Sequence, residues 1–230
     1  MRSRSTAPWK AGAICPEMEA GPEKMSAPSV VVFDLGKVLV DFDYSIAARK
    51  LGPRARLSAP DLQYLLCRSP LLCQYETGAI NSAQFHRGVC RAAGFDLALE
   101  EFRACFADIF SEIHPMTALH AGLRAAGVPT WVFSNTNEIA ARHIRRRFPF
   151  FSNFDGYVLS YEHGALKPDA KIYEVLERLT GRKGGAILYL DDRAENVAAG
   201  LERGWRAVLH ETPEKSRRAV SDAGLPISQL

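Results

Sequence analysis

The chain has 230 residues, which is enough for one large domain or for a core domain with a smaller insertion. Hydrophobic residues make up 47% of it and charged residues 24%, as in soluble globular proteins, and no apolar run approaches the roughly 18 residues that span a membrane. The 29 basic and 26 acidic residues nearly balance, so we expect no large single-signed surface and neither nucleic acid nor a membrane as a partner.

The amino-terminal and cysteine patterns favour a cytoplasmic protein. Residues 1–27 are rich in Pro, Gly, Ser and Glu and lack the apolar stretch of a secretory signal, so we expect a disordered extension there. The five cysteines form no CxxC pair, and their odd number disfavours a disulfide scaffold or a zinc site. We therefore expect reduced thiols, and the pattern favours no particular oligomeric state.

From residue 28 onward, short apolar strands alternate with amphipathic helices. The predicted strands are Val30–Phe33, Thr130–Phe133, Gly156–Leu159, Ala186–Leu190 and Arg206–Leu209. The predicted helices between them are Thr117–Ala126, Asn137–Arg147, Asp169–Leu179 and Ala194–Arg203. This alternation is typical of the α/β class, and it predicts a doubly wound, Rossmann-like parallel sheet with helices on both faces.

One long segment, residues 43–115, interrupts the alternation. It shows no convincing strand, and its patterns predict the helices Tyr44–Leu51, Ser58–Cys67, Ser69–Glu76, Ser82–Ala93 and Leu99–Phe110. We interpret it as a helical cap inserted into a core that comprises residues 28–42 and 116–212. Residues 213–230 then form a C-terminal tail.

Polar side chains follow the predicted core strands at the points where these strands end. Asp34 follows the first strand, Ser134 the second, and the pair Asp191 and Asp192 follows the run AILYL. Lys167 lies in the loop GALKPD. Because the carboxyl ends of strands in a doubly wound sheet meet at one crevice, we expect these side chains to lie close together.

This combination of groups suits the transfer of a phosphoryl group. A carboxylate at a strand end can act as the nucleophile and form an aspartyl-phosphate. Clustered carboxylates favour Mg²⁺, which prefers oxygen ligands. Lys167, the Ser134 hydroxyl and the backbone amide of Asn135 are then the candidate groups that bind the oxygens of phosphate. Each of these residues alone also has an ordinary structural explanation, such as a helix cap or a surface lysine.

Four segments together resemble the haloacid dehalogenase superfamily of hydrolases. They are VVFDLGKVLVD, WVFSNTNE, ALKPDAKIY and LYLDDRAENV, in the family's order and spacing. The inserted segment carries YETGAINSAQF, which is similar to the cap of members with a helical cap between the first two motifs. Within the superfamily, the form DLGxV resembles sugar-phosphate phosphatases of the bacterial glucose-1-phosphate phosphatase type.

The resemblance implies a role for each motif residue. Asp34 matches the nucleophile, Ser134 and Lys167 match the groups that bind phosphate, and the backbone carbonyl of Gly36 matches a magnesium ligand. Asp192 matches the direct magnesium ligand, with Asp191 as a second acidic partner or alternate ligand. The implied protein is an Mg²⁺-dependent phosphatase that hydrolyses a small phosphomonoester, expected to be a sugar phosphate, through an aspartyl-phosphate.

Gly36 departs from the family pattern, because most phosphatases of the superfamily carry an Asp at this position as the general acid and base. Such catalysis contributes about 10²–10⁴-fold in rate. The substrate then has a good leaving group, or another acid such as Asp41, Asp43 or a cap residue replaces the missing one, or the protein binds phosphorylated ligands with weak turnover. A metal-independent haloacid dehalogenase is a further alternative, which the acidic pair and the phosphate-binding set disfavour.

Several residues outside the motifs are candidates for contact with the substrate. The four in the cap are Tyr44, Tyr75, Glu76 and His86. His163 precedes the Lys167 loop and is a fifth candidate. For each of them, packing or solvent exposure is the competing explanation.

Overall fold

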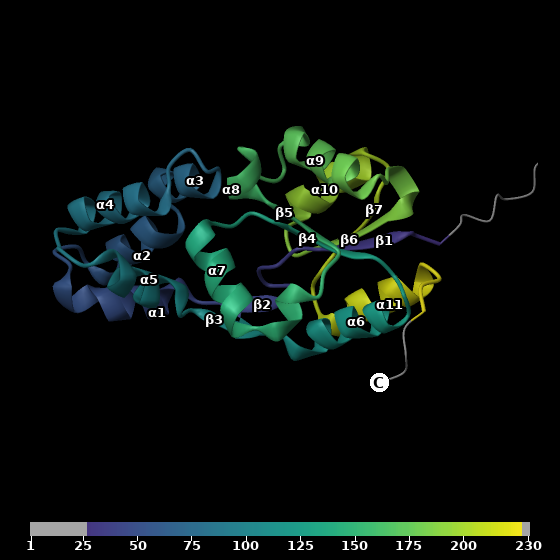
Figure 1. Cartoon of the computed structure of the whole chain (residues 1–230), viewed down its shortest axis with the longest axis horizontal. Coiled ribbons are helices and arrows are strands. Elements are labelled where there is room, and N and C mark those ends of the chain that lie inside the picture. Colours follow the sequence, from purple (N-terminus) through teal and green to yellow (C-terminus); the bar gives the residue numbers. More distant parts are fainter. Residues whose placement is uncertain (1–26, 227–230) are drawn as a thin grey trace, which may run out of the picture.

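The structure is a computed structural model that describes residues 27–226. The predicted disordered extension therefore lies outside the described residues, except for residue 27. The chain forms a core built on a sheet and a cap made of helices, which lie at opposite ends of the long axis (Figure 1). No helix within residues 27–226 is long and apolar enough to cross a membrane.

The core contains a five-stranded parallel sheet in the order β5-β4-β1-β6-β7. Its strands are β1 (Val30–Phe33), β4 (Thr130–Ser134), β5 (Gly156–Leu159), β6 (Ile187–Asp191) and β7 (Arg206–Leu209). The chain leaves the central strand β1 toward β4 and β5 and then returns to add β6 and β7 on the other side. This reversal creates the crevice in which doubly wound folds bind ligands, and it confirms the predicted fold class.

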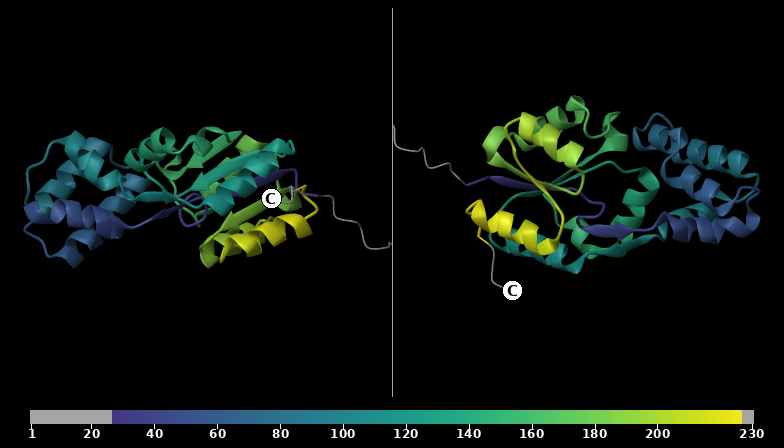
Figure 2. Two further views of the ribbon diagram at one scale, coloured as in Figure 1. Left: turned by 90° about the horizontal axis from the view of Figure 1, so that it is seen from below. Right: turned by 180° about the vertical axis from the view of Figure 1, so that it is seen from behind.

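Helices cover both faces of the sheet because every residue of β1 is apolar and buried. Val31 and Phe33 pack toward one face, and Val30 and Val32 pack toward the other. The first face is covered by α6 (His114–Ala125), α7 (Glu138–Arg147) and α11 (Pro213–Asp222), and the second by α9 (Ala170–Thr180) and α10 (Ala194–Glu202) (Figures 1 and 2). Short elements complete the core: α8 (Ser160–His163) and the 3₁₀ turns Pro149–Ser152 and Gly184–Ala186.

The segment expected as a C-terminal tail contains the helix α11. Its amino terminus is capped by Thr212, whose hydroxyl accepts a hydrogen bond from the backbone N–H of Lys215. Val220 is fully buried against the core. The sequence PEKSRRAVSD has only Ala219 and Val220 as apolar helix-forming residues. It therefore lacks the apolar periodicity from which a helix could be predicted.

The cap consists of α1 (Tyr44–Leu51), α2 (Ala59–Cys67), α3 (Pro70–Glu76), α4 (Ser82–Ala93) and α5 (Leu99–Ala107), with a 3₁₀ turn at Gly52–Arg54. It has its own apolar core, in which the ring of Phe85 stacks on Tyr75 at a centroid distance of 4.5 Å. The rings of Phe102 and Phe106 also contact Phe85. The five predicted cap helices are thus present, and four of them start and end within one residue of the prediction.

Two short strands join the cap to the core, and the prediction that residues 43–115 contain no strand was wrong. β2 (Val40–Phe42) and β3 (Phe110–Glu112) pair antiparallel, with Val40 opposite Glu112 and Phe42 opposite Phe110. The predicted helix Leu99–Phe110 ends at Ala107 instead. A three-residue strand gives too short a pattern to detect, and Phe110 continued the apolar spacing of the preceding helix.

The aromatic core of the cap leads to a prediction about stability. Replacing the fully buried Phe85 by Ala leaves a cavity among three rings, so Phe85→Ala should lower the free energy of unfolding by about 3–5 kcal/mol. Tyr64 on α2 is 55% exposed, and Tyr64→Ala should change it by less than about 0.5 kcal/mol. Urea unfolding followed by circular dichroism measures both values, and equal effects would contradict this account of the cap.

Candidate active site

The three central strands bring the predicted polar residues to one edge of the sheet. Asp34 directly follows β1, whereas Ser134 and Asp191 are the last residues of the neighbouring strands β4 and β6. The backbone N–H of Asp34 donates to the carbonyl of Leu190 at 2.9 Å, which fixes the end of β1 against β6. All three side chains are buried or nearly so. The convergence expected from the parallel topology is therefore present.

The ammonium group of Lys167 lies at the centre of this arrangement. Its Nζ donates to the carboxylate of Asp34 at 2.9 Å, to the carboxylate of Asp191 at 2.6 Å and to the backbone carbonyl of Phe133 at 2.8 Å. The side chain of Lys167 is 1% exposed. Lys167 thus uses its three N–H donors on groups from β1, β4 and β6.

Asn135 holds the Lys167 loop in place through its side chain. Its Nδ2 donates to the backbone carbonyl of Lys167 at 2.9 Å, and its Oδ1 accepts from the backbone N–H of Lys167 at 2.7 Å. Helix α7 begins at Glu138 with Asn137 as its cap, so Asn135 lies in the loop before the helix. Ser134 is 2% exposed, and its hydroxyl makes a long contact of 3.3 Å with the carbonyl of Asn135.

Asp191 is held by several donors of the protein. Besides Lys167, its carboxylate accepts from the hydroxyl of Tyr189, from the side-chain amide of Asn196 at 3.0 and 3.2 Å, and from the backbone N–H of Arg193 at 2.8 Å. Neither Tyr189 nor Asn196 was among the residues predicted for the site. Asn196 lies within the motif LYLDDRAENV, whereas Tyr189 occupies an ordinary apolar strand position with nothing to mark it.

The carboxyl groups of this cluster have pKa values shifted in opposite directions. Burial acts to raise the pKa of Asp191, but the ammonium group of Lys167 outweighs it and holds that pKa below its usual value. Burial raises the pKa of Asp34, and the nearby carboxylate of Asp191 adds to this, while Lys167 acts in the opposite direction. Burial and Asp191 also raise the pKa of Asp192. Two of the three carboxylates therefore lack sufficient positive charge nearby. Burial lowers the pKa of Lys167, but the carboxylates of Asp34 and Asp191 outweigh it and hold that pKa above its usual value.

The donor set fits a divalent cation that prefers oxygen. One carboxylate oxygen each from Asp34, Asp191 and Asp192 lies within 4.8 Å of the others. Hydrogen-bond donors of the protein already occupy the carboxylate of Asp191. The carboxylates left to bind a cation directly are therefore those of Asp34 and Asp192. Asn196 Oδ1 is buried and accepts no hydrogen bond from the described residues, so it can accept one from a water molecule. Magnesium, which keeps several water ligands, matches these donors.

A cavity of about 420 Å³ opens over the strand ends and is lined by both parts of the protein. The core contributes Asp34, Gly36, Lys37, Ser134, Asn135, Lys167, Asp192, Arg193 and Asn196. The cap and its linkers contribute Phe42, Tyr44, Cys67, Leu72, Glu76 and Phe110. The residues predicted for chemistry therefore share one cavity with side chains of the cap, except for Asp191, which lies beneath them.

An aromatic ring fills the space beside Gly36, the position at which the sequence resemblance leads one to expect an acid. A Cβ atom at Gly36 would lie 2.8 Å from Cε1 of Phe42, so the ring would have to move for any side chain. Asp41 is exposed and pairs with Lys37, while Asp43 caps α1 through hydrogen bonds to Ser45. Neither acid lines the cavity.

Of the other residues proposed for substrate contact, only two line the cavity. These are Tyr44 and Glu76. Tyr75 is buried in the cap, Nε2 of His86 donates to the carbonyl of Leu97 at 2.8 Å, and His163 ends the short helix α8 and does not line the cavity. For Tyr75 and His86 the structure therefore shows packing and a local hydrogen bond, and none of these three residues has a position in the cavity.

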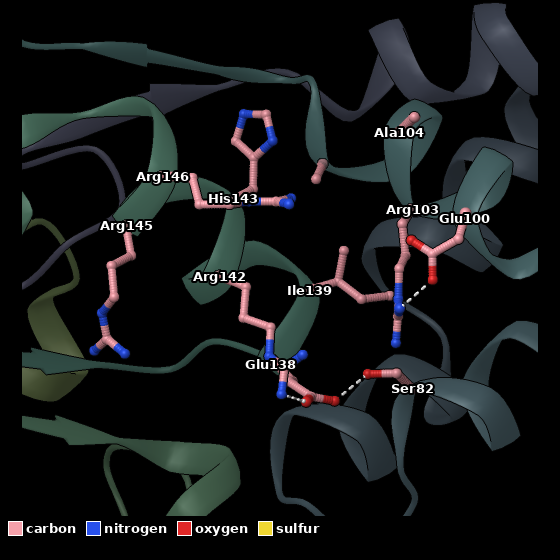
Figure 3. A pocket seen from close by; sticks show the side chains of 11 residues that line it. Ser82, Glu100, Arg103, Ala104, Glu138, Ile139, Arg142, His143, Arg145 and Arg146 are labelled. Carbon is pink, nitrogen blue, oxygen red and sulfur yellow. Dashed lines mark hydrogen bonds and ion pairs between the residues drawn. The ribbon is translucent and has the colours of Figure 1, made fainter.

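A second cavity, of about 500 Å³, lies between α5 of the cap and α7 of the core (Figure 3). Its charged side chains are largely paired with each other: Arg103 with Glu100, and Arg142 with Glu138 at 2.8 Å. Ser82 of α4 also donates to Glu138, which ties the cap to the core. Asp34, Ser134, Lys167 and Asp192 do not line this cavity, so the candidate active site is the cavity over the strand ends.

Comparison with known proteins places this arrangement in a family. Residues 28–204 match the sequence pattern of a protein family described as "haloacid dehalogenase-like hydrolase". The chain is 24% identical over 201 residues to D-ribitol-5-phosphate phosphatase of Bacteroides thetaiotaomicron, covering 83% of this chain and 96% of that protein. It is 27% identical over 203 residues to a pyrimidine 5′-nucleotidase of Escherichia coli, with coverages of 80% and 88%.

The fold agrees with this assignment. A crystal structure of a haloacid dehalogenase family enzyme from Bacteroides thetaiotaomicron, in complex with magnesium and inorganic phosphate, matches with a TM-score of 0.69 and 22% identity. The match covers 79% of this chain and 93% of that one. The family match over residues 28–204 includes all four motifs and most of the chain. This chain belongs to the haloacid dehalogenase-like hydrolases.

Proposed function

We propose that this hydrolase is a magnesium-dependent phosphatase that cleaves a small phosphomonoester, a sugar or polyol phosphate, through a phosphorylated Asp34. The observation that carries the proposal is the buried ammonium group of Lys167, 2.9 Å from the Asp34 carboxylate, with the Ser134 hydroxyl at the adjacent strand end. A nucleophile beside a cation and a hydroxyl donor suits a phosphoryl group, which carries its charge on several oxygens. The curated relatives named above are a phosphatase and a nucleotidase.

In this mechanism the Asp34 carboxylate attacks phosphorus, and the bond between phosphorus and the leaving oxygen breaks. The ammonium group of Lys167 supplies positive charge beside the phosphoryl oxygens, and the Ser134 hydroxyl donates to one of them, which holds the group in line with Asp34. Water then attacks the phosphorylated Asp34 and releases phosphate. Asn135 contributes by holding the Lys167 backbone, and Asp191 by orienting the ammonium group.

Asp34, Asp192 and the backbone carbonyl of Gly36 would hold Mg²⁺. The ion, when bound, supplies positive charge that offsets the repulsion between the carboxylates and an incoming phosphate. The raised pKa of Asp34 and of Asp192 supports this assignment, because a cation beside both groups favours their ionised forms. The cavity of about 420 Å³ has a volume suited to a small molecule.

Two other functions make different demands on the site. Carbon–halogen hydrolysis uses a strand-end Asp and needs no metal. It therefore does not account for the acidic pair Asp191 and Asp192 or for the phosphate-binding groups of Ser134 and Lys167. A protein that binds phosphorylated ligands without efficient turnover is favoured by one observation, the absence of an acid at Gly36. A panel of phosphomonoesters with Mg²⁺, together with 2-haloacids without it, distinguishes the three by their products.

The nucleophile can be tested directly. Asp34→Asn removes the attacking carboxylate, so release of phosphate from p-nitrophenyl phosphate should fall at least about 10³-fold. Asp41→Asn makes the same change on an exposed residue outside the cavity and should leave release unchanged. Circular dichroism spectra like that of the wild type at the assay temperature would show that both variants are folded. Undiminished turnover by Asp34→Asn would refute the mechanism.

Metal dependence gives a second test with a binding readout. Chelation with EDTA should abolish phosphatase activity and added Mg²⁺ should restore it. Because Asp192 is the carboxylate left free to bind a cation beside Asp34, Asp192→Asn should weaken Mg²⁺ binding at least about tenfold. Isothermal titration calorimetry with Mg²⁺ alone measures this, with Asp41→Asn as the control. Unaltered Mg²⁺ affinity in Asp192→Asn would contradict the proposed ligand set.

A further inference from the structure

The proposed reaction needs a proton donor for the leaving oxygen, and the position two residues after the nucleophile does not provide one. Gly36 has no side chain, and the Phe42 ring occupies the space beside it. Among the described residues that line the cavity, the carboxyl groups are those of Asp34, Asp192 and Glu76. The first two are the proposed nucleophile and the proposed metal ligand, which leaves Glu76 of the cap.

The backbone on both sides of Glu76 is fixed against the core. On one side is Tyr75, whose hydroxyl accepts a hydrogen bond at 3.0 Å from the backbone N–H of Ile139 in α7. The same hydroxyl also contacts the hydroxyl of Ser82 at 2.6 Å. Two residues after Glu76, Gly78 passes so close to α8 that a Cβ atom there would lie 2.1 Å from the carbonyl oxygen of Tyr161. Glu76 is therefore held over the cleft at the place where α3 meets the core.

The carboxyl group of Glu76 is available for chemistry. It is half-buried, and no hydrogen bond or ion pair within residues 27–226 engages it. Burial raises the pKa of Glu76 to about 7, and Arg193 of the core, across the cavity, acts in the opposite direction. A carboxyl group that titrates near neutral pH can both donate and accept a proton during one catalytic cycle.

The other titratable groups of the cavity do not meet this need. Burial raises the pKa of Tyr44 and of Cys67, which face Glu76 from α1 and α2, so both stay protonated and cannot accept a proton from water. Lys37 is engaged with Asp41 and with the carbonyl of Phe42, and Lys167 with Asp34 and Asp191. Arg193 pairs with Glu195.

We propose that Glu76 is the general acid and base of the reaction and replaces the carboxylate that Gly36 omits. This proposal rests on the phosphatase function proposed above. As the bond between Asp34 and phosphorus forms, protonated Glu76 gives its proton to the departing oxygen and becomes a carboxylate. That carboxylate takes a proton from the water that attacks phosphorus. The bond to Asp34 then breaks, phosphate leaves, and Glu76 is protonated again.

Two substrates of similar shape separate this role from simple substrate binding. The leaving group of p-nitrophenyl phosphate departs as a stabilised anion without a proton, whereas that of phenyl phosphate is more basic and needs one. Glu76→Gln should therefore lower kcat for phenyl phosphate about 10²-fold or more, and for p-nitrophenyl phosphate less than about tenfold. Glu101→Gln makes the same change on an exposed cap residue that pairs with Arg54, and it should behave as the wild type.

The dependence on pH provides an independent readout. The wild-type kcat for phenyl phosphate should fall as the pH rises through about 7, because Glu76 loses the proton that the leaving group needs. This fall should be absent in Glu76→Gln and retained in Glu76→Asp. An equal loss on both substrates, or an unchanged pH profile, would overturn the role of Glu76. Absence of wild-type turnover with either substrate would instead refute the phosphatase function itself.

Discussion

The buried ion cluster around Lys167 is the interaction on which the rest of the site depends. One ammonium group joins the carboxyl ends of β1, β4 and β6 through Asp34, the carbonyl of Phe133 and Asp191. Removing one partner of such a buried cluster leaves charge uncompensated, which costs about 3–5 kcal/mol. The group that joins the ends of the central strands therefore also contacts the nucleophile, so the geometry of the site is tied to the stability of the cluster.

Much of this could be predicted from the sequence, because parallel strands must end at a common edge. The bounds of β1 and the joint placement of Asp34, Ser134, Lys167 and the acidic pair follow from that rule and from the apolar runs. The contact between the side-chain amide of Asn135 and the backbone of Lys167 could not be predicted, because the two residues lie 32 positions apart and only the folded loop brings them together. The pairing of β2 with β3 could not be predicted for a different reason, because each strand has only three residues and shows no detectable pattern.

The absence of an acid at Gly36 looks, in sequence, like the simple loss of one group. The structure shows that the space has been filled, since the ring of Phe42 packs where a side chain would start and contacts Tyr44 edge-on at 5.8 Å. An aromatic ring therefore lines that side of the nucleophile's surroundings. An apolar wall excludes water near the leaving group, which strengthens electrostatic interactions within the cavity.

The paired linkers β2 and β3 have a mechanical consequence. Because they share backbone hydrogen bonds, neither can slide past the other without breaking them, and the cap is connected to the core by one two-stranded ribbon instead of two independent tethers. Phe42 belongs to that ribbon. Any bending of the ribbon therefore shifts the wall beside Gly36 together with the cap, so the entrance to the cavity and the space next to Asp34 change shape as a single movement.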